Sequence, residues 1–377
     1  MSRDAVGGAR APEDAASGGR RIVVGAGALG ALLAAQWTAA GVPAVLVARG
    51  AALDAIGERG VLVRRPHGDE RVAVDVVGSI DEAEPVPGDT VVLAVKTQDA
   101  EQALAAIAWR PLVGGGVVAD LPVVTLQNGL ATEDVALRRF ARVVGVSVAI
   151  PASHLRPGEV VAPSWPTLGT ARVGAVTGRA ADLEQRVSDD LARAGFAASV
   201  VADIAATKRR KLLANLRNVV EVFGVDDAGR DAATASLRDE AGALFDRLGL
   251  AVAPAEAAFV PVEHVPGHIA GRLSTWQSLE RGASVESDFL VGELVLLARR
   301  AGLSAPLAEA VQRDLGVLAS RGGRPGVAPL PAALAEAVPD GQPSAVPSPS
   351  APTAVEPGGP AAPSPSTSAA TFVGAAT

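Results

Sequence analysis

Apolar and polar residues follow two successive patterns along the chain. Between Arg21 and about Val201, short apolar runs alternate with amphipathic stretches, which is typical of β-strands joined by helices. From about Ile204 onward the apolar positions recur with a helical period. The order predicts an α/β protein, with a Rossmann-type doubly wound parallel sheet followed by an all-α second domain.

The expected elements follow this order. Strands are expected at 21–24, 44–48, 91–95, 122–127, 142–149, 171–176 and 196–201, with a hairpin over about 61–77. Helices are expected at 28–40, 98–109, 131–140, 180–194, 204–223, 231–248, 254–260, 285–301 and 305–319, with 261–275 as the main irregular connection.

These elements divide the chain into four parts. Residues 1–19 are a Gly- and Ala-rich extension, 20–203 the dinucleotide-binding domain, 204–325 the helical substrate domain, and 326–377 a tail rich in Pro, Ala and Ser. We expect the extension and the tail to be disordered, because such compositions bury too little apolar surface to fold.

An uncharged run covers residues 22–48, behind Arg20 and Arg21. Its length also suits a membrane span or a secretion signal. Glycines and a proline interrupt it where a strand, a helix and a second strand would change over, at Gly25, Gly27, Gly30, Gly41 and Pro43. A membrane span needs no such breaks, so we expect no membrane partner.

Composition narrows the function classes. The formal net charge of −7 argues against a nucleic-acid partner. The absence of cysteine excludes disulfides and thiolate metal sites, and it suits a cytoplasmic protein. His264 and His268 are spaced like metal ligands, but Pro266 and Gly267 between them disfavour a helix, so we expect no metal.

Lysine is rare in this chain. Arginine occurs 31 times and lysine three times, at Lys96, Lys208 and Lys211. A buried ammonium can lose its proton near neutral pH, whereas a guanidinium cannot. The three lysines are therefore candidates for proton chemistry, although chance would also leave a few lysines in an arginine-rich chain.

A glycine-rich turn follows the first predicted strand and matches the dinucleotide fingerprint in its required context. Gly25 permits the tight turn, Gly27 lets the backbone approach a pyrophosphate, and Gly30 lets the helix pack on the strand. The amide groups at the start of the helix attract the anion. The predicted cofactor-binding segment is Gly25, Ala26, Gly27, Ala28, Leu29 and Gly30.

The end of the second predicted strand distinguishes the two nicotinamide cofactors. An NAD enzyme usually presents an acidic residue there to the ribose hydroxyls. This chain has Arg49, which can pair with a 2′-phosphate, so the sequence favours NADPH/NADP. The alternative is that Arg49 is a solvated loop residue.

Polar residues also stand at the ends of two predicted strands. Lys96 ends one and Asn128 ends another, at the edge of an open α/β sheet where ligands bind. Lys96 could bind the cofactor or a substrate anion, and Asn128 the nicotinamide or a substrate oxygen. Both could equally be turn-forming residues.

A polar stripe lies on the first helix of the second domain. Lys211, Asn215 and Asn218 are spaced i, i+4 and i+7, which places them on one face. The amine could protonate a carbonyl oxygen while the amides position the substrate. A solvent-exposed polar face is the alternative.

From about Arg21 to Leu318 the chain resembles the ketopantoate reductases (2-dehydropantoate 2-reductases). The resemblance rests on GAGALG followed by Arg49, VKT at Lys96, TLQNG at Asn128, KLLANLRN at Lys211, and STWQSLERG with VESDFLVGE. It implies an NADPH domain, a helical domain and an active site between them. By this similarity Lys211 looks like the general acid, Asn215 and Asn218 like substrate contacts, Ser274 like a ligand of the substrate carboxylate, and Glu286 like the acidic partner at the reacting hydroxyl.

Three positions depart from the commoner pattern of that family. Val219 stands where the second Asn is usual, Ser278 where Asp is common, and Val291 where Asn often precedes the glycine. We interpret these changes as surrounding the substrate, which leaves the identity of the 2-oxo acid open. Glu286 also has an alternative reading, as an ordinary carboxylate at a helix start.

The leading hypothesis is an NADP-dependent oxidoreductase that reduces a small 2-oxo acid, 2-dehydropantoate to pantoate, a step of pantothenate biosynthesis. The alternatives are a related enzyme for a different 2-oxo acid, and a non-catalytic NADPH-binding sensor or interaction protein. The sequence leaves the oligomeric state open, a homodimer included.

Overall fold

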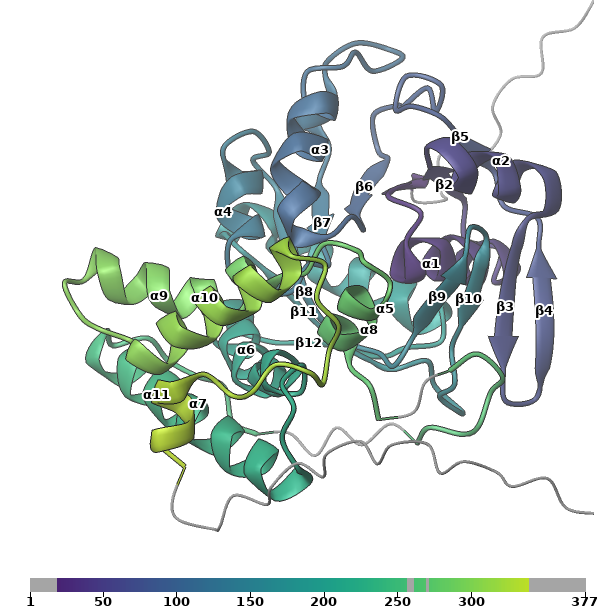
Figure 1. Cartoon of the computed structure of the whole chain (residues 1–377). Coiled ribbons are helices and arrows are strands. Elements are labelled where there is room, and N and C mark those ends of the chain that lie inside the picture. The colour runs from purple at the N-terminus through teal and green to yellow at the C-terminus, as the bar shows by residue number, and fades with distance from the viewer. Residues whose placement is uncertain (1–18, 256–260, 269–270, 339–377) are drawn as a thin grey trace, which may run out of the picture. The chain divides into compact units, whose positions relative to one another are not determined.

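The computed structural model describes residues 19–255, 261–268 and 271–338. The expected disorder of 1–19 and most of the expected tail lie outside these residues, as does most of the helix expected at 254–260. Figure 1 shows a strand-containing first part, followed along the chain by a part built from helices.

The first part is built on an eight-stranded sheet in the order β12-β11-β8-β7-β6-β1-β2-β5. The six strands from β8 to β5 are parallel, which confirms the predicted fold class. One detail was wrong: β11 pairs antiparallel with β8, so β11 and β12 run against the other six. The strands are β1 (Arg21–Val24), β2 (Ala44–Val47), β5 (Val76–Val77), β6 (Thr90–Leu93), β7 (Val123–Thr125), β8 (Val143–Ala149), β11 (Thr170–Ala175) and β12 (Ala197–Val200).

Both faces of this sheet are buried, because alternate side chains of each strand point to opposite sides. On β1, Val23 packs with α1 and α5, whereas Ile22 and Val24 pack with α3 and α4. Figure 1 shows the helices on both sides of the strands. The helices of this part are α1 (Ala28–Ala39), α2 (Gly50–Arg59), α3 (Ala100–Ile107), α4 (Thr132–Leu137) and α5 (Glu184–Arg193).

The uncharged run at 22–48 forms β1, α1 and β2, the strand–helix–strand unit that its glycines predicted. No helix in the described ranges is both long and apolar enough to span a bilayer.

A second sheet packs against α1. Its order is β4-β3-β10-β9, and its elements are β3 (Val61–Arg65), β4 (Gly68–Val72), β9 (Ser153–Arg156) and β10 (Glu159–Val161). The β3–β4 hairpin confirms the one predicted around residues 66–69. The strands β9 and β10 were not predicted, because both are short and β10 joins the sheet by pairing with β3, about 100 residues earlier in the chain, while β9 pairs with β10.

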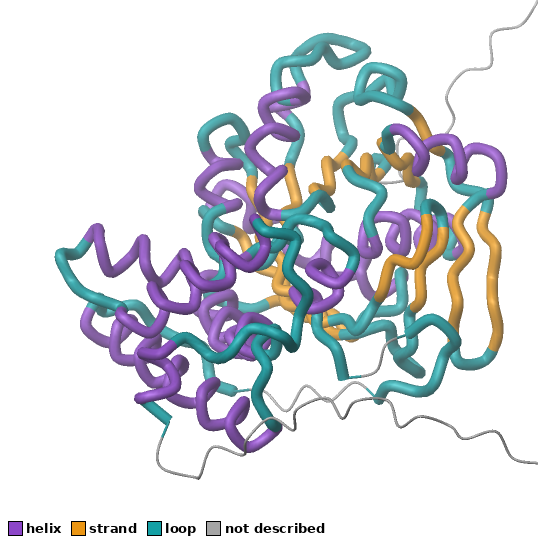
Figure 2. Tube along the Cα trace, in the orientation of Figure 1, coloured by secondary structure: helices purple, strands orange, loops and turns teal. Residues whose placement is uncertain are grey.

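The second part is helical, and Figure 2 shows it as purple helices joined by teal loops. Its helices share one apolar core, which includes Leu216, Phe245 and Leu294. The elements are α6 (Ile204–Val220), α7 (Asp227–Arg247), α8 (Ser274–Glu280), the 3-10 helix η4 (Ser287–Phe289), α9 (Val291–Arg300), α10 (Pro306–Ser320) and α11 (Ala332–Glu336).

Two predicted boundaries in this part were wrong. The helix expected at 285–301 is divided, with η4 and α9 separated at Leu290, whose backbone is not helical. Part of the tail expected to be disordered from residue 326 is folded, because α11 packs on α7 and α10 and Leu334 is fully buried. Gly326 also donates its backbone N–H to the Val222 carbonyl.

Candidate active site

The glycine turn between β1 and α1 has the geometry that a dinucleotide needs. Gly25 has φ +113°, a conformation that side chains other than glycine rarely adopt. A Cβ on Gly30 would overlap the Gly25 carbonyl oxygen, so this position needs glycine for close packing. A Cβ on Gly27 would meet nothing within 4 Å. The open side of Gly27 and the free amides at the start of α1 fit a bound pyrophosphate.

Arg49 lies at the other expected cofactor contact, just after β2. It is the N-cap residue of α2 and is exposed. Within the described ranges no acidic side chain pairs with it, so its guanidinium is available to an anion. The position and the exposure fit a 2′-phosphate at this strand end.

Lys96 follows β6 and is half-buried next to the glycine turn, since a Cβ on Gly25 would contact Val95. Its Nζ donates to the Ser284 carbonyl at 2.6 Å and to the Ser278 hydroxyl at 3.3 Å. Burial lowers its pKa, and Arg281 lowers it further, against Glu286 and Asp99, which raise it. The first and second parts of the chain therefore meet at this amine.

Glu286 connects the ends of β6 and β7. Its Oε1 accepts from the Thr97 backbone N–H at 3.1 Å and from the Thr97 hydroxyl at 2.9 Å. The Asn128 amide donates to Oε2 at 3.4 Å, and the Asn215 amide donates to the Asn128 oxygen at 3.4 Å. This network joins two predicted strand-end residues to the α6 stripe.

The stripe on α6 faces the ends of the strands and the start of α8. Lys211 Nζ donates to the Val148 carbonyl at the end of β8. Asn218 is buried, and its amide donates to the hydroxyl of the exposed Ser274 at 3.3 Å. Lys211, Asn215 and Asn218 are thus directed into the fold and do not form a solvated face.

The environment of Lys211 makes it a stronger acid than an ordinary lysine. Its pKa is lowered to about 8, mainly by burial and further by the positive charge of Lys208, while the carboxylate of Glu286 partly opposes both. An amine with this pKa is protonated at neutral pH and can release a proton to a developing alkoxide.

Lys208 has a different environment from the other two lysines. It is buried, pairs with Glu133 and donates to the Gln127 carbonyl at 3.2 Å. Its ammonium is bonded to these two partners within the protein, so the geometry gives no support to proton chemistry at Lys208. The scarcity of lysine in the chain nevertheless drew attention to Lys208, which bonds to the residue before Asn128.

The three departures from the family pattern lie in two kinds of environment. Val219 and Val291 are fully buried in the helical core. Ser278 is the exception, because its hydroxyl accepts from Lys96. The interpretation that these positions surround the substrate stays a prediction, and Ser278 is the one bonded to the predicted site residue Lys96.

Several residues of the site were not singled out in the sequence. Thr97 holds Glu286, Ser284 holds Lys96, and Val148 offers its carbonyl to Lys211. Thr97 had a signal, since it directly follows Lys96 at the strand end. The other two act through backbone carbonyls, which leave no mark on the side-chain sequence.

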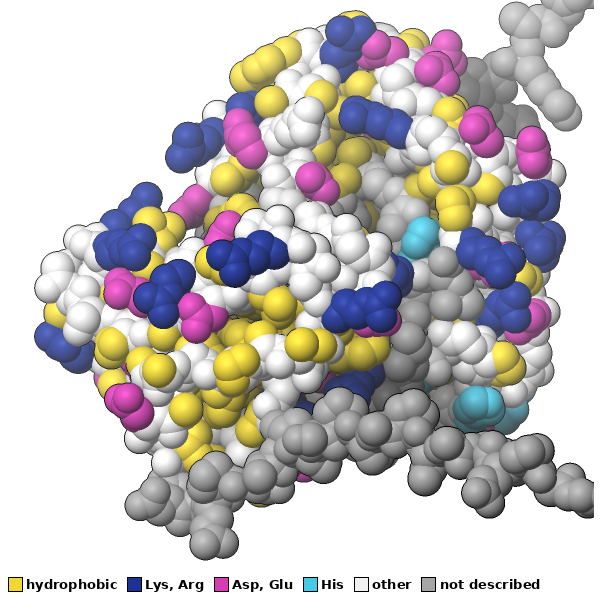
Figure 3. Space-filling view, viewed as in Figure 1, with side chains coloured by type: hydrophobic (Ala, Val, Ile, Leu, Met, Phe, Trp, Pro, Cys, Tyr) yellow, Lys and Arg dark blue, Asp and Glu magenta, His cyan; other side chains and the backbone are white. Residues whose placement is uncertain are grey.

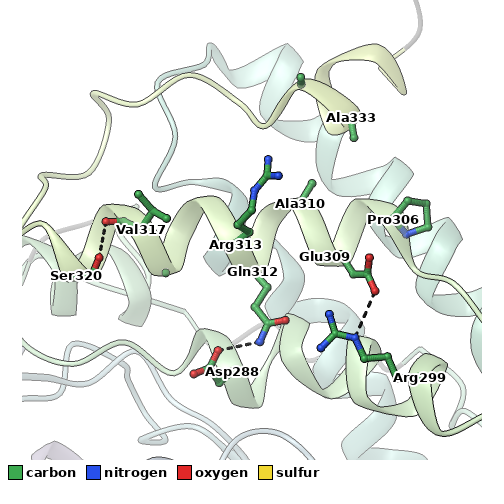
Figure 4. A pocket seen from close by; sticks show the side chains of 12 residues that line it. Asp288, Arg299, Pro306, Glu309, Ala310, Gln312, Arg313, Val317, Ser320 and Ala333 are labelled. Carbon is green, nitrogen blue, oxygen red and sulfur yellow. Dashed lines mark hydrogen bonds and ion pairs between the residues drawn. The ribbon is translucent and has the colours of Figure 1, made fainter.

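A surface groove of the helical part lies away from these residues. It has a volume of about 740 Å³, runs along α10 and is lined by residues such as Asp288, Gln312 and Ala333. Figure 4 shows Gln312 pointing to Asp288, to which it donates at 2.9 Å, and Arg299 pairing with Glu309 at 3.5 Å. The face in Figure 3 mixes acidic and basic side chains. None of the predicted site residues lines this groove.

Comparison with known proteins identifies the family. Residues 22–176 match the family model "Ketopantoate reductase PanE/ApbA", and residues 204–318 match its C-terminal counterpart. The chain belongs to the ketopantoate reductase family. Together the two matches cover the elements that carry the site, and membership makes the chain an oxidoreductase.

Curated relatives of this family are similar over most of their length. The 2-dehydropantoate 2-reductase of Archaeoglobus fulgidus is 28% identical over 302 residues, which is 78% of this chain and 94% of the relative. That of Pyrococcus horikoshii is 24% identical over 295 residues, or 76% and 92%.

Solved structures share the fold. The 2-dehydropantoate 2-reductase from Methylococcus capsulatus matches with a TM-score of 0.64 and 20% identity, over 81% of this chain and 98% of that one. D-mandelate dehydrogenase with NADH matches with a TM-score of 0.65 and 17% identity, over 80% and 99%.

Proposed function

We propose that this chain is an NADPH-dependent 2-dehydropantoate 2-reductase. The proposal depends on one observation: the polar stripe of α6 lies against the chain segments that follow β6 and β7. There Asn215 bonds to Asn128, Asn128 bonds to Glu286, and the charge of Glu286 acts on Lys211. Family membership and the names of the curated relatives support the same reaction.

The cofactor proposal rests on the glycine turn and Arg49. A nicotinamide dinucleotide fits the open side of Gly27, and Arg49 favours the 2′-phosphate form. When bound, it supplies the hydride for the carbonyl carbon. Lys96, half-buried between the turn and α8, would hold an anionic or hydroxyl group at the boundary of cofactor and substrate.

Side chains of the protein donate the proton and bind the substrate. Lys211 donates its proton to the carbonyl oxygen as that oxygen gains negative charge, and the carbonyl becomes a hydroxyl. Glu286 accepts a hydrogen bond from the hydroxyl. Ser274 and Asn218 bind the substrate carboxylate, and Asn215 and Asn128 fix the orientation of the carbonyl.

The proposal is tested by steady-state kinetics on the purified full chain. NADPH oxidation is followed with 2-dehydropantoate and with a panel of 2-oxo acids of increasing size. We expect the highest kcat/KM with NADPH and 2-dehydropantoate. Tight NADPH binding without turnover on any member of the panel would instead support a non-catalytic nucleotide sensor.

A reductase for a different 2-oxo acid is the second candidate. Two observations favour it: Ser278 replaces the common Asp beside Lys96, and the fold also matches D-mandelate dehydrogenase. The panel therefore includes the 2-oxo acid that corresponds to mandelate. A kcat/KM higher for this aromatic acid than for 2-dehydropantoate would favour the second candidate.

A further inference from the structure

A buried ion pair lies directly behind the proposed general acid. Lys208 is 4% exposed and Glu133 7%, and the two side chains are bonded to each other. Glu133 also accepts from the Thr125 hydroxyl at 2.6 Å. Lys208 precedes Lys211 by three residues on α6, so both side chains lie on the same face of the helix.

The pair joins α4 of the sheet-containing part to α6 of the helical part. Glu133 lies in α4 and Thr125 at the end of β7, whereas Lys208 comes from α6. Lys208 also donates to the carbonyl of Gln127, the residue before Asn128. Two turns further along the helix, Asn215 donates to Asn128 itself. The helix is therefore attached to consecutive residues of one strand exit.

We propose that the Lys208–Glu133 pair is a positioning element of the active site, which holds α6 on the Gln127–Asn128 strand exit and keeps a permanent positive charge beside Lys211. This inference rests on the proposed function for its catalytic meaning. Neither residue is expected to touch substrate or cofactor, because both are buried beneath the stripe.

Two charged groups act on Lys211, and they act in opposite directions. Lys208 on α6 lowers its pKa, and Glu286, from the loop before η4, raises it. On the other side of the pair, Glu133 faces Glu293 of α9, a buried carboxyl whose pKa burial raises to about 7. Glu133 fixes the position of the Lys208 ammonium by pairing with it, and the positive charge of Lys208 lowers the pKa of Lys211.

The scarcity of lysine makes this proposal directly measurable. Lysine labelled with ¹³C at Cε gives signals from only three side chains, at Lys96, Lys208 and Lys211. Their chemical shifts report ionisation of each amine, and single Lys→Met variants assign them. The titration needs neither cofactor nor substrate, so it does not depend on turnover.

The decisive variant replaces both partners by apolar side chains, Lys208→Met with Glu133→Leu. Exchanging a buried ion pair for apolar residues of similar volume often leaves a protein folded. In the full-length chain we expect the titration midpoint of Lys211 to rise from about 8 toward the ordinary lysine value. Lys208→Arg, which keeps the charge, is the matched control and should leave the midpoint near 8.

A midpoint that stays near 8 in the folded double variant would overturn the inference, whether or not Lys208→Arg folds. With an active enzyme, the alkaline limb of reductive kcat/KM should move in parallel with the midpoint, whereas a purely structural pair would lower the rate without moving the limb. If the midpoint moves but no 2-oxo acid is reduced, the proposed function fails and the electrostatic role of the pair remains.

Discussion

At the scale of single residues, the account depends on the ionisation of Lys211. The reaction in the reducing direction uses the protonated amine, and burial lowers its pKa to about 8. We therefore expect reductive kcat/KM to be level below this pH and to fall as the pH rises through it. A pH–rate profile with NADPH held saturating checks this. A rate that rises with pH across the same range would contradict a proton donor here.

We expect Arg49 to determine the preference for NADPH over NADH. Replacing it with Gln removes the group proposed to pair with the 2′-phosphate, while the NADH contacts are untouched. The KM for NADPH should rise at least about tenfold, since a charge-assisted bond is worth roughly 1.5–3 kcal/mol. Kinetics with both cofactors measure this change. Arg59→Gln, an exposed arginine at the other end of α2, is the matched control, and equal losses with NADPH and NADH would remove the assignment.

The residues of the site differ in how far the sequence could predict them. Lys211, Asn215 and Asn218 follow from helical spacing, and Lys96 and Asn128 follow from their places at strand ends. The partner of Lys208 could not be predicted, because Glu133 is 75 residues away and reaches it only through the packing of α4 and α6. The same long-range packing buries Val219 and Val291 in the helical core, which their positions in the sequence do not reveal.

At the scale of elements, the turn between β1 and α1 gives glycines separate tasks. A Cβ at Gly30 would overlap the Gly25 carbonyl, whereas one at Gly27 would meet no atom of the protein within 4 Å. Gly30→Ala should therefore lower the thermal midpoint, and Gly27→Ala should leave it nearly unchanged but weaken NADPH binding. Thermal unfolding and cofactor titration of both variants measure this. The idea fails if Gly27→Ala binds NADPH as tightly as the natural chain.

Most of the long elements were predictable because their apolar periodicity is strong and their ends carry glycine or proline. The short ones were not. Helix α2 begins at Gly50, which has φ +52°, and only Ala48 and Arg49 separate it from β2, so little in the sequence marks its start. Helix α8 has seven residues and no side-chain cap. Strand β10 depends on pairing with β3, and β9 depends on pairing with β10. Tertiary contacts decide such segments more than local preference does.

At the scale of the whole molecule, the helical core extends beyond α10. Leu334 of α11 is fully buried in the core of the second part, although its segment has the composition of a disordered tail. The composition of a whole segment does not reveal that a single apolar side chain, here Leu334, packs into the core. The described helical core therefore extends past residue 325, where the second domain was predicted to end.

Leu334→Ala should therefore destabilise the protein by about 2–5 kcal/mol, the usual cost of emptying a buried leucine site. Val327→Ala, at a side chain that is 77% exposed, is the matched control and should change stability by less than about 0.5 kcal/mol. Denaturant unfolding measures both. Equal effects of the two substitutions would mean that α11 is not part of the cooperative core.

The central claim is that one amine on α6 protonates a carbonyl reduced at the dinucleotide turn. The most direct measurement is the single-turnover rate of NADPH oxidation with 2-dehydropantoate in Lys211→Met, with Arg209→Met as the control on the same helix. Loss of general acid catalysis should slow the Lys211 variant by about 10²–10⁴-fold, with NADPH affinity unchanged and the Arg209 variant close to the natural chain. A Lys211→Met protein that transfers hydride at the natural rate would contradict the account.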